Sequence, residues 1–325
     1  MPSHNGKIAI GIDIGGTSIK SALISERGEI LSKELTPIPF FDEENSVIKT
    51  ILSIISIHYN SIINKKQLAG IGLGAPGNVN RKKGMIVDGA YNLPGINSIP
   101  LAKHIVTHFN LPFYIDNDAT SACKGEFLFG AGKEYDHMIL LTLGTGVGGG
   151  IILNRRVFHG VSDYAGEIGH MTLYPEGMLC SCGNRGCLEA YASATAMINY
   201  AKQAVKRNED TKLSQIPLDQ IDGKIIFQFA HEGDHMAIQI INNIGRYIAI
   251  GIGNIINLLN IPLVVIGGGL SEGGDILFQS INKHINDYIL PPLKKTFEIK
   301  KALLGNDAGV IGAASAVFME GETSY

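Results

Sequence analysis

Two segments of the chain share one order: a short apolar strand, a glycine-rich turn and a second strand. The first segment runs from Lys7 to Ser25 with Gly15 and Gly16 in its turn, and the second begins at His137, about 130 residues later. Apolar runs separated by glycines in this way predict β-hairpins rather than strands that lead directly into helices. Each hairpin opens a stretch of helix and strand patterns, so the sequence predicts an α/β protein with a weak internal duplication. We expect the two turns to face each other across a cleft.

The composition agrees with a large folded chain. Of 325 residues, 45% are hydrophobic and 18% charged, whereas roughly 25% charged residues is usual for soluble domains. The length suggests roughly two domains. The 27 Lys and Arg residues against 30 Asp and Glu give a net charge of -3, which argues against nucleic acid or an anionic membrane as a partner.

No targeting or membrane-spanning segment is expected. The most apolar window, residues 255–270, is interrupted by asparagines, a proline and glycines, which is not typical of a transmembrane helix. The four cysteines are too few for a disulfide scaffold. We therefore expect a cytoplasmic protein.

The spacing of apolar residues predicts further elements. Helices are expected over residues 45–63, 99–109 and 235–259, and strands over residues 68–73, 113–115 and 263–266. In the longest helix, one apolar stripe is expected to consist of Ile238, Ile241, Ile244, Ile248, Ile252, Ile255 and Leu259.

Both glycine-rich turns are candidate phosphate sites. In the first, Asp13 to Thr17, glycine backbone N–H groups can face a phosphate and the carboxylate can hold Mg²⁺, although an ordinary hairpin turn would look similar. The second, Leu143 to Gly150, formally contains G-x-G-x-x-G. A dinucleotide fingerprint must open a helix, and strand-like residues follow this turn. A P-loop motif is also absent from the sequence.

Asp118 is the candidate general base. It follows a predicted strand and stands next to Asn117. A carboxylate on a loop at the end of a strand can take a proton from a substrate hydroxyl. Asp116 competes for the same role, and Asp and Asn are also common turn residues.

Three cysteines within eight residues, Cys180, Cys182 and Cys187, form the sharpest local signal. Thiols at this spacing, separated by glycines, suit a structural tetrahedral Zn²⁺. The preferred fourth ligand is His170, with His159 and Cys123 as alternatives. A disulfide between Cys180 and Cys182 would be strained.

The segment His231 to His235 matches H-E-x-x-H on paper. That metalloprotease motif needs an unbroken helix. Gly233 and Asp234 instead predict the end of one helix and the N-cap of the next.

Taken together, these motifs resemble the ROK family (repressor, open reading frame, kinase), and in particular its sugar kinases of the bacterial glucokinase type. The resemblance spans nearly the whole chain. It rests on Asp13-Ile-Gly-Gly-Thr17, Gly72 to Gly77, Asn92-Leu93, Asn117-Asp118-Ala119, Leu143 to Gly149, Gly166-Glu-Ile-Gly-His170, Cys180 to Glu189 and Val265 to Gly269.

The resemblance implies a two-domain actin-like, hexokinase-like ATPase (ribonuclease H-like) α/β fold, with an interdomain cleft and a zinc knuckle. It implies a small domain of residues 1–118 plus 306–325 and a large domain of residues 119–305. By the same resemblance we expect structural Zn²⁺, Mg²⁺ with ATP, and a homodimer.

The resemblance also assigns roles to residues. Asp118 would be the base that deprotonates the sugar hydroxyl, and the zinc ligands would be His170, Cys180, Cys182 and Cys187. ATP, its phosphates and Mg²⁺ would lie near Asp13, Gly15, Gly16, Thr17, Lys20, Gly144, Thr145, Gly146, Gly268 and Gly269. The sugar would be bound by Gly74, Asn92, Asn117, Asp118, Glu167, His170 and Glu189. One ring nitrogen of His170 would face the zinc and the other the sugar.

The expected reaction is transfer of the γ-phosphate of ATP to the 6-hydroxyl of glucose. An N-acylhexosamine, N-acetylmannosamine or N-acetylglucosamine, is the second candidate substrate, and fructose or mannose kinases share most of these motifs. A sugar-responsive repressor of the same family is the rival class. It would carry a helix-turn-helix domain before the first turn, where only twelve residues precede Asp13. A filament-forming or chaperone ATPase would not need the sugar-binding residues.

Overall fold

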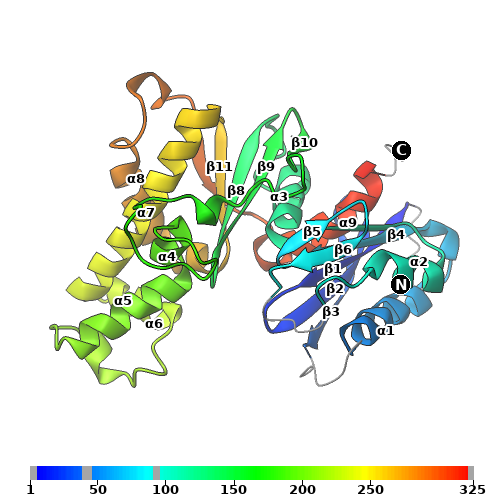
Figure 1. The fold of residues 1–325 in the computed structure, drawn as a ribbon, viewed down its shortest axis with the longest axis horizontal. Helices are drawn as coiled ribbons and strands as arrows, with labels where there is room; N and C mark the ends of the chain where they lie inside the picture. The colour runs from blue at the N-terminus through cyan, green and yellow to red at the C-terminus, as the bar shows by residue number, and fades with distance from the viewer. Residues whose placement is uncertain (1–5, 39–45, 91–95, 321–325) are drawn as a thin grey trace. The chain divides into compact units, whose positions relative to one another are not determined.

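The computed structural model describes residues 6–38, 46–90 and 96–320. The chain forms two compact units: Met1–Asp136 with Gly150–Gly166 and Leu303–Tyr325, and His137–Gly149 with Glu167–Ala302 (Figure 1). Within the described residues, the strands form two five-stranded sheets and one two-stranded sheet.

These units divide the chain differently from the domain boundaries expected at residues 118 and 305. Residues 119–136 and 150–166 belong to the first unit because helix α3 (Asp118–Phe129) packs against helix α9 (Ala308–Glu320). Gly125 allows that packing, since a Cβ there would lie 2.4 Å from the Ala308 carbonyl oxygen.

The first unit is built on a sheet of strand order β3-β2-β1-β4-β7. Its strands are β1 (Ile8–Ile14), β2 (Ser18–Ser25), β3 (Ile30–Pro37), β4 (Leu68–Ala75) and β7 (Phe113–Asn117). Strands β1, β4 and β7 run parallel, with Asp13 opposite Gly74, and Ala75 opposite Asn117. The carboxyl ends of parallel strands meet at one edge of a sheet, so these candidate residues lie side by side.

Two hydrophobic cores cover the two faces of this sheet, as the two-residue period of a strand requires. On β1, the side chains of Ile8, Ile10 and Ile12 belong to the core that includes residues of α1 (Ser46–Ser61) and α2 (Leu101–Phe109). Ala9 belongs to the core that includes α9. A one-residue shift of β1 would exchange these faces.

Helix α9 approaches the sheet closely because the facing strand positions are glycines. A Cβ on Gly72 would lie 1.8 Å from the Ala313 carbonyl oxygen, and one on Gly11 would lie 2.3 Å from the Val310 carbonyl oxygen. Such contacts are possible only without a side chain. Part of the glycine content therefore serves helix packing rather than turns.

Shorter elements complete the first unit. They are the 3-10 helix η1 (Lys65–Gln67), strands β5 (Asn78–Asn80) and β6 (Met85–Asp88), which pair with each other, strand β10 (Arg156–Val157), and η6 (Gly305–Asp307).

The second sheet has the strand order β10-β9-β8-β11-β12. Its remaining strands are β8 (Met138–Leu143), β9 (Val147–Leu153), which passes from the second unit into the first, β11 (Leu263–Gly267) and β12 (Glu298–Lys301). The helices of the second unit are η2 (Ile168–His170), α4 (Leu188–Ala192), α5 (Ala194–Lys206), η3 (Lys212–Gln215), α6 (Gly223–His231), α7 (His235–Leu259), η4 (Gly269–Gly273), α8 (Asp275–Ile285) and η5 (Pro291–Leu293).

Helix α7 has the predicted bounds, but the ends of its predicted stripe are not buried. Ile241, Ile244 and Ile248 are fully buried, whereas Ile238 is 38% and Leu259 39% exposed. Ala237, next to Ile238, and Ile256, three residues before Leu259, are both fully buried, so the buried face at the helix ends passes through neighbours of the predicted stripe. Asp234 caps α7 through its side chain and α6 ends at His231. The two histidines of the H-E-x-x-H match therefore stand on different helices, as predicted.

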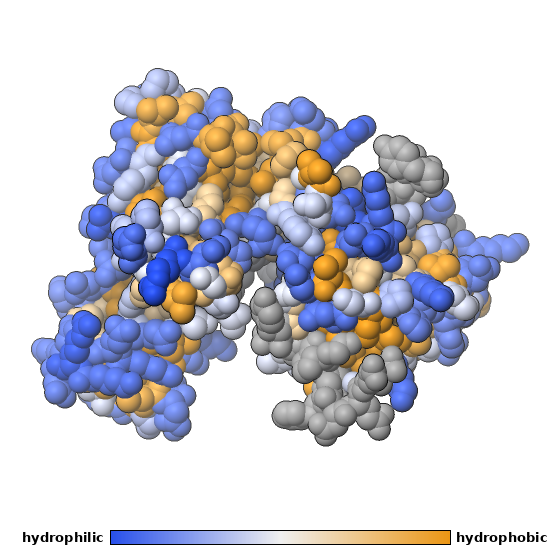
Figure 2. All heavy atoms as spheres, viewed as in Figure 1, coloured by the Kyte–Doolittle hydropathy of each residue, from blue (hydrophilic) through white to orange (hydrophobic). Residues whose placement is uncertain are grey.

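Hydrophilic side chains cover much of the visible surface, and apolar side chains gather in patches between them (Figure 2). Among the described residues, no helix is long and apolar enough to cross a membrane.

Candidate active site

The first glycine-rich turn joins β1 to β2. The Gly15 N–H donates to the Ser18 carbonyl at 3.0 Å, while Gly16 and Thr17 are exposed at the tip. A turn with exposed backbone N–H groups is suited to an anion.

Asp13, at the end of β1, lies under the start of α9. A Cβ on Gly309 would lie 2.6 Å from Asp13 Oδ2. Burial raises the pKa of this carboxyl group, Lys20 at 3.9 Å opposes the shift and Asp307 adds to it. The Lys20 ammonium also donates to the Asn306 carbonyl at 2.6 Å, which holds this cation beside the turn.

Asn117 and Asp118 mark the junction of β7 and α3. The Asn117 side chain caps α3 by accepting from the N–H groups of Ala119 and Thr120 at 2.9 and 3.2 Å. Asp118 is the first residue of the helix, and its Oδ1 accepts from Ala119 N–H at 2.8 Å. A helix N-terminus stabilises the anionic form of a carboxylate.

Gly74 lies against this helix start. A Cβ on Gly74 would lie 3.6 Å from the Asp118 Cα atom, and the Asn117 amide donates to the Gly77 carbonyl at 3.2 Å. The structure thus brings Gly74, Asn117 and Asp118 together. The other sugar candidate of this part of the chain, Asn92, lies outside the described residues.

Asp116 is not suited to the role of base because its carboxylate is buried and bonded to basic side chains. It is 5% exposed, and its Oδ2 lies 2.9 Å from His159 Nε2 and 3.3 Å from Lys124 Nζ. Burial alone would raise its pKa, but Lys124, the hydrogen bond from His159 and Arg81 outweigh burial and lower the pKa to about 2.

The second glycine-rich turn joins β8 to β9. It is hydrogen-bonded to the segment that follows the cysteines. Val147 N–H donates to Glu189 Oε2 at 3.0 Å, Ala194 N–H to the Gly144 carbonyl at 2.8 Å, and the Thr195 hydroxyl to the Thr145 carbonyl at 2.7 Å. Thr145 itself is exposed. Sequence analysis does not single out Thr195, because a threonine at a helix start carries no signal of a distant partner.

Gly268 and Gly269 lie at the end of β11, next to this turn. Gly268 has φ +82°, and a Cβ there would lie 2.6 Å from Leu143 N. A Cβ on Gly269 would meet no atom within 4 Å. These glycines leave an open backbone edge beside Gly144.

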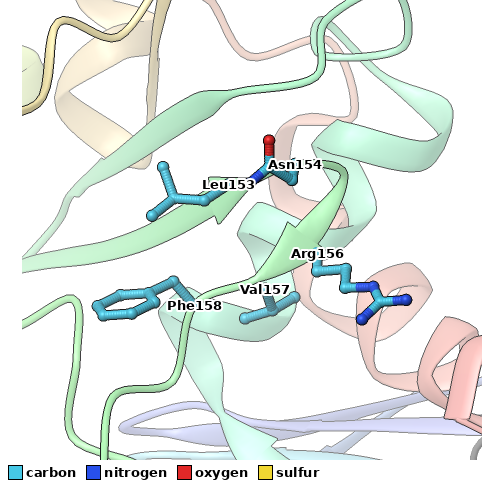
Figure 3. A pocket seen from close by; sticks show the side chains of 5 residues that line it. All are labelled: Leu153, Asn154, Arg156, Val157 and Phe158. Atoms are coloured by element: carbon cyan, nitrogen blue, oxygen red, sulfur yellow. The ribbon is translucent and has the colours of Figure 1, made fainter.

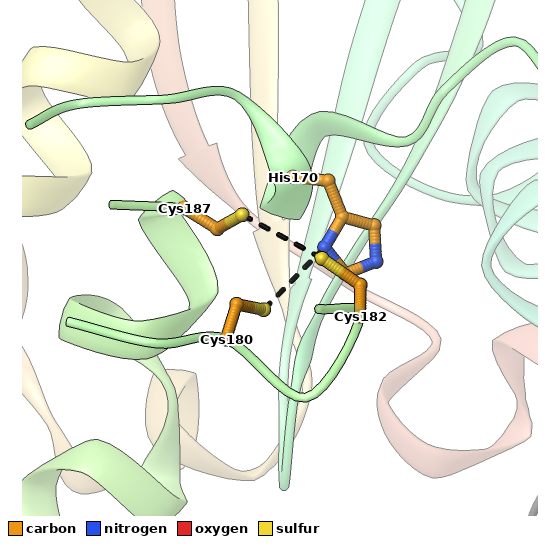
Figure 4. Close-up of side chains that lie close together, drawn as sticks. All are labelled: His170, Cys180, Cys182 and Cys187. Atoms are coloured by element: carbon orange, nitrogen blue, oxygen red, sulfur yellow. Dashed lines mark hydrogen bonds between the residues drawn. The ribbon is translucent and has the colours of Figure 1, made fainter. Parts of the chain in front are cut away.

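His170, Cys180, Cys182 and Cys187 form a group that could hold a metal ion (Figure 4). Their ligand atoms lie within 4.8 Å of one another. Cys182 Sγ and Cys187 Sγ are 3.7 Å apart, and Cys180 Sγ lies 3.8 Å from His170 Nδ1. Two sulfurs bound tetrahedrally at about 2.3 Å would be about 3.8 Å apart. The donor set therefore fits one tetrahedral ion.

The two alternative fourth ligands lie elsewhere. His159 contacts Asp116 in the first unit, and Cys123 is buried against Gly150. All four cysteines are free thiols, so no disulfide competes with the cluster.

Two carboxylates border the metal-ligand group. Glu167 Oε2 lies 3.6 Å from His170 Nε2, and Glu189 Oε1 lies 3.6 Å from Cys180 Sγ. Partial burial raises the pKa of Glu167, His170 opposes this shift and Glu189 adds to it. The second unit thus gathers the three sugar candidates Glu167, His170 and Glu189.

One pocket of the first unit contains none of the predicted site residues. It lies beside the hairpin of β9 and β10 and is lined by Leu153, Asn154, Arg156, Val157 and Phe158 (Figure 3).

A model of the ROK family matches residues 9–319 of the chain. The chain belongs to the ROK family. A ROK relative, the glucokinase of Halalkalibacterium halodurans, is 41% identical over 313 residues, covering 93% of this chain and 92% of the relative. The xylose repressor of Caldicellulosiruptor bescii is 31% identical over 96% of this chain and 78% of the repressor.

A solved ROK structure has the same fold. The glucokinase from Streptomyces griseus in complex with glucose and AMPPNP has a TM-score of 0.81, is 32% identical, and matches over 94% of this chain and 98% of its own.

Proposed function

We propose that this ROK protein is an ATP-dependent kinase that transfers the γ-phosphate of ATP to the 6-hydroxyl of glucose. The observation that carries the proposal is the likeness to glucokinases along nearly the whole chain, at 41% identity over 93% of its length in one case. The Streptomyces griseus structure, a complex with glucose and AMPPNP, supports the choice of both substrates.

Asp118 is the proposed general base. Its carboxylate takes the proton of the 6-hydroxyl, the oxygen attacks the γ-phosphorus of ATP, and the bond from that phosphorus to the β,γ-bridging oxygen breaks to release ADP. The position at the first turn of α3, with one carboxylate oxygen held by Ala119 N–H, supports this role because it fixes the direction of the side chain.

The two glycine-rich turns are the proposed phosphate sites. The first set consists of Gly15, Gly16, Thr17 and Lys20, of which Gly16 and Thr17 are exposed, and the second set consists of Gly144, Thr145 and Gly146. The open edge at Gly268 and Gly269 suits the adenosine. The Mg²⁺ that accompanies ATP neutralises phosphate charge, and Asp13 is the carboxylate placed to hold it.

Hydroxyl groups of the sugar are proposed to contact polar groups at Gly74, Asn117, Glu167, His170 and Glu189. Asn92 is proposed to contribute by family resemblance alone.

We further propose that His170, Cys180, Cys182 and Cys187 bind a structural Zn²⁺. Three thiolates and one imidazole form a closed ligand set, so the ion would hold the loop between His170 and Glu189. Binding through Nδ1 would leave Nε2 of His170, on the side of Glu167, for the sugar. By family resemblance we propose a homodimer, and the free thiols and the need for ATP support a cytoplasmic location.

Mg²⁺-ATP turnover measured as ADP release tests the proposed substrate. We expect kcat/KM for glucose to exceed that for N-acetylmannosamine, N-acetylglucosamine, fructose and mannose at least tenfold, which corresponds to about 1.4 kcal/mol. Preference for an acetamido sugar would make the protein an N-acylhexosamine kinase. No turnover with any sugar would favour a sugar-sensing protein, as the likeness to xylose repressors allows.

A further inference from the structure

A charged cluster within the first unit is centred on Asp116, two residues before the proposed base. It joins Asp116 to Lys124, His159 and Arg81. Lys124 is 1% exposed and lies on α3 two turns beyond Asp118. His159 and Arg81 come from two other segments: the residues after β10 and those after β5. The cluster therefore holds three separate parts of the first unit together.

The direction of the hydrogen bonds fixes the tautomer of His159. Arg81 Nη1 lies 3.3 Å from His159 Nδ1, and a guanidinium can only donate. Nδ1 is then the acceptor, and the ring proton resides on Nε2, which donates to Asp116 Oδ2 at 2.9 Å. A neutral imidazole thus links the guanidinium to the carboxylate.

The other oxygen of Asp116 reaches the segment that carries the proposed base. Asp116 Oδ1 accepts from Asn117 N–H at 3.0 Å. Asn117 in turn caps α3, whose first residue is Asp118. A change in the orientation of the Asp116 carboxylate would therefore turn the peptide from which the base projects.

We propose that His159 is a positioning residue for Asp118, acting through the Asp116 carboxylate, and that Arg81 selects the ring tautomer this requires. The inference rests on the proposed kinase function. A hydrogen-bonded neutral donor leaves Asp116 fully charged and holds it in one direction, whereas Lys124, as a point charge, supplies attraction without fixing that direction.

Substitution of His159 tests the inference. In His159→Leu we expect kcat for glucose phosphorylation to fall about tenfold, because small displacements of a reacting group are costly. The KM for ATP should stay within about twofold, since none of the proposed ATP contacts depends on Asp116, whereas the KM for glucose should rise with the displacement of Asn117, a proposed sugar contact. In His159→Gln, whose side-chain amide can donate to Asp116, kcat should recover to within about threefold of wild type.

A matched control separates positioning from stability. His58 is a buried histidine of the first unit, bonded to the Ser21 hydroxyl at 2.8 Å. His58→Leu should lower the melting temperature and leave kcat unchanged. If His159→Leu does not fold, Arg81→Met is the replacement test, because the ring then loses the donor that fixes its tautomer. In that variant kcat should fall at unchanged KM for ATP.

Three results would overturn the inference: wild-type kcat in His159→Leu, equal losses in the Leu and Gln variants, or a rise of KM without a change of kcat. Asp118→Asn, measured in parallel, distinguishes a failure of the proposed base from a failure of the proposed positioning role. If Asp118→Asn retains turnover, the assignment of the base fails. If Asp118→Asn is inactive while His159→Leu is unaffected, only the positioning role fails.

Discussion

The backbone N–H of Val147 donates to the carboxylate of Glu189 at 3.0 Å. This bond joins the second glycine-rich turn to the loop of the metal-ligand cysteines. A Cβ on Gly146 would lie 2.3 Å from the same carboxylate oxygen, so the residue at position 146 must be small for Glu189 to reach the turn. Glu189 is thus placed to influence both proposed substrates.

Substitution of Glu189 should therefore affect both substrates. We expect Glu189→Ala to raise KM for glucose and for ATP at least about fivefold each, since it removes a charge-assisted hydrogen bond to the turn. The Glu167 carboxylate lies against His170 Nε2 at 3.6 Å, so Glu167→Ala should raise KM for glucose alone. Initial rates at varied ATP and varied glucose measure this, and an unchanged KM for ATP in Glu189→Ala would contradict the coupling.

The Thr195 hydroxyl should matter for ATP and not for sugar. Thr195→Val keeps the shape but removes the donor to the Thr145 carbonyl. One hydrogen bond contributes about 0.5–1.5 kcal/mol, so we expect KM for ATP to rise roughly two- to tenfold at constant KM for glucose. Thr195→Ser retains the donor and should behave as wild type. Equal kinetics for the Val and Ser variants would show that the bond has no role.

Removal of one cysteine should remove the proposed zinc. We expect about one zinc per chain by elemental analysis of the purified protein, and a large loss in Cys182→Ser together with a lower melting temperature. Cys123→Ala changes a thiol outside the cluster and should keep its zinc. A native protein without bound zinc, or a Cys182→Ser variant with full occupancy, would refute the site.

The Asp116 carboxylate should contribute to stability in a defined pH window. Its pKa is lowered from 3.8 to about 2 in the folded chain, so its contribution is complete above pH 4 and is lost as the pH falls towards 2. The lowered pKa corresponds to a contribution to the free energy of unfolding of roughly 2 kcal/mol. Denaturant unfolding of wild type and Asp116→Asn should show a difference in stability that shrinks over this window. A difference independent of pH between 5 and 2 would contradict the assignment.

The first glycine-rich hairpin and the longest helix could be predicted from sequence because the signals for them lie within short segments of the chain. The β1–β2 hairpin and α7 follow from apolar periodicity and from Gly, Pro and Asp at their ends. Helix α3 gave no such signal: it is buried over nearly its whole length, so its apolar and polar residues show little helical periodicity. The sequence analysis does not predict strand β3, none of whose residues is buried: Ser32 and Thr36 are half-buried and the others are exposed, so the strand has no buried apolar face.

Some residues of the candidate site can be recognised from their neighbours in the sequence, and others only from the folded structure. The cysteine spacing and the position of Asp118 after a strand are visible in the chain. In the structure the three thiols lie with His170, and Asp118 follows β7 as the first residue of α3 rather than on a loop. The bond between His159 and Asp116 joins residues 43 positions apart, and that between Thr195 and Thr145 joins residues 50 apart. Such pairs arise from tertiary packing and leave no pattern in a single sequence. Likewise, Gly72 is needed because α9 passes over it, which the strand pattern does not reveal.

The most direct test of the account is the rate of glucose phosphorylation by Asp118→Asn compared with wild type. Asparagine retains the size and an oxygen that can accept from Ala119 N–H, but it cannot take up the proton, so we expect kcat to fall at least about a hundredfold. Glucose affinity, measured by calorimetry, should change less than about threefold. Turnover close to wild type in a correctly folded Asp118→Asn protein would contradict the role of Asp118 and the mechanism built on it.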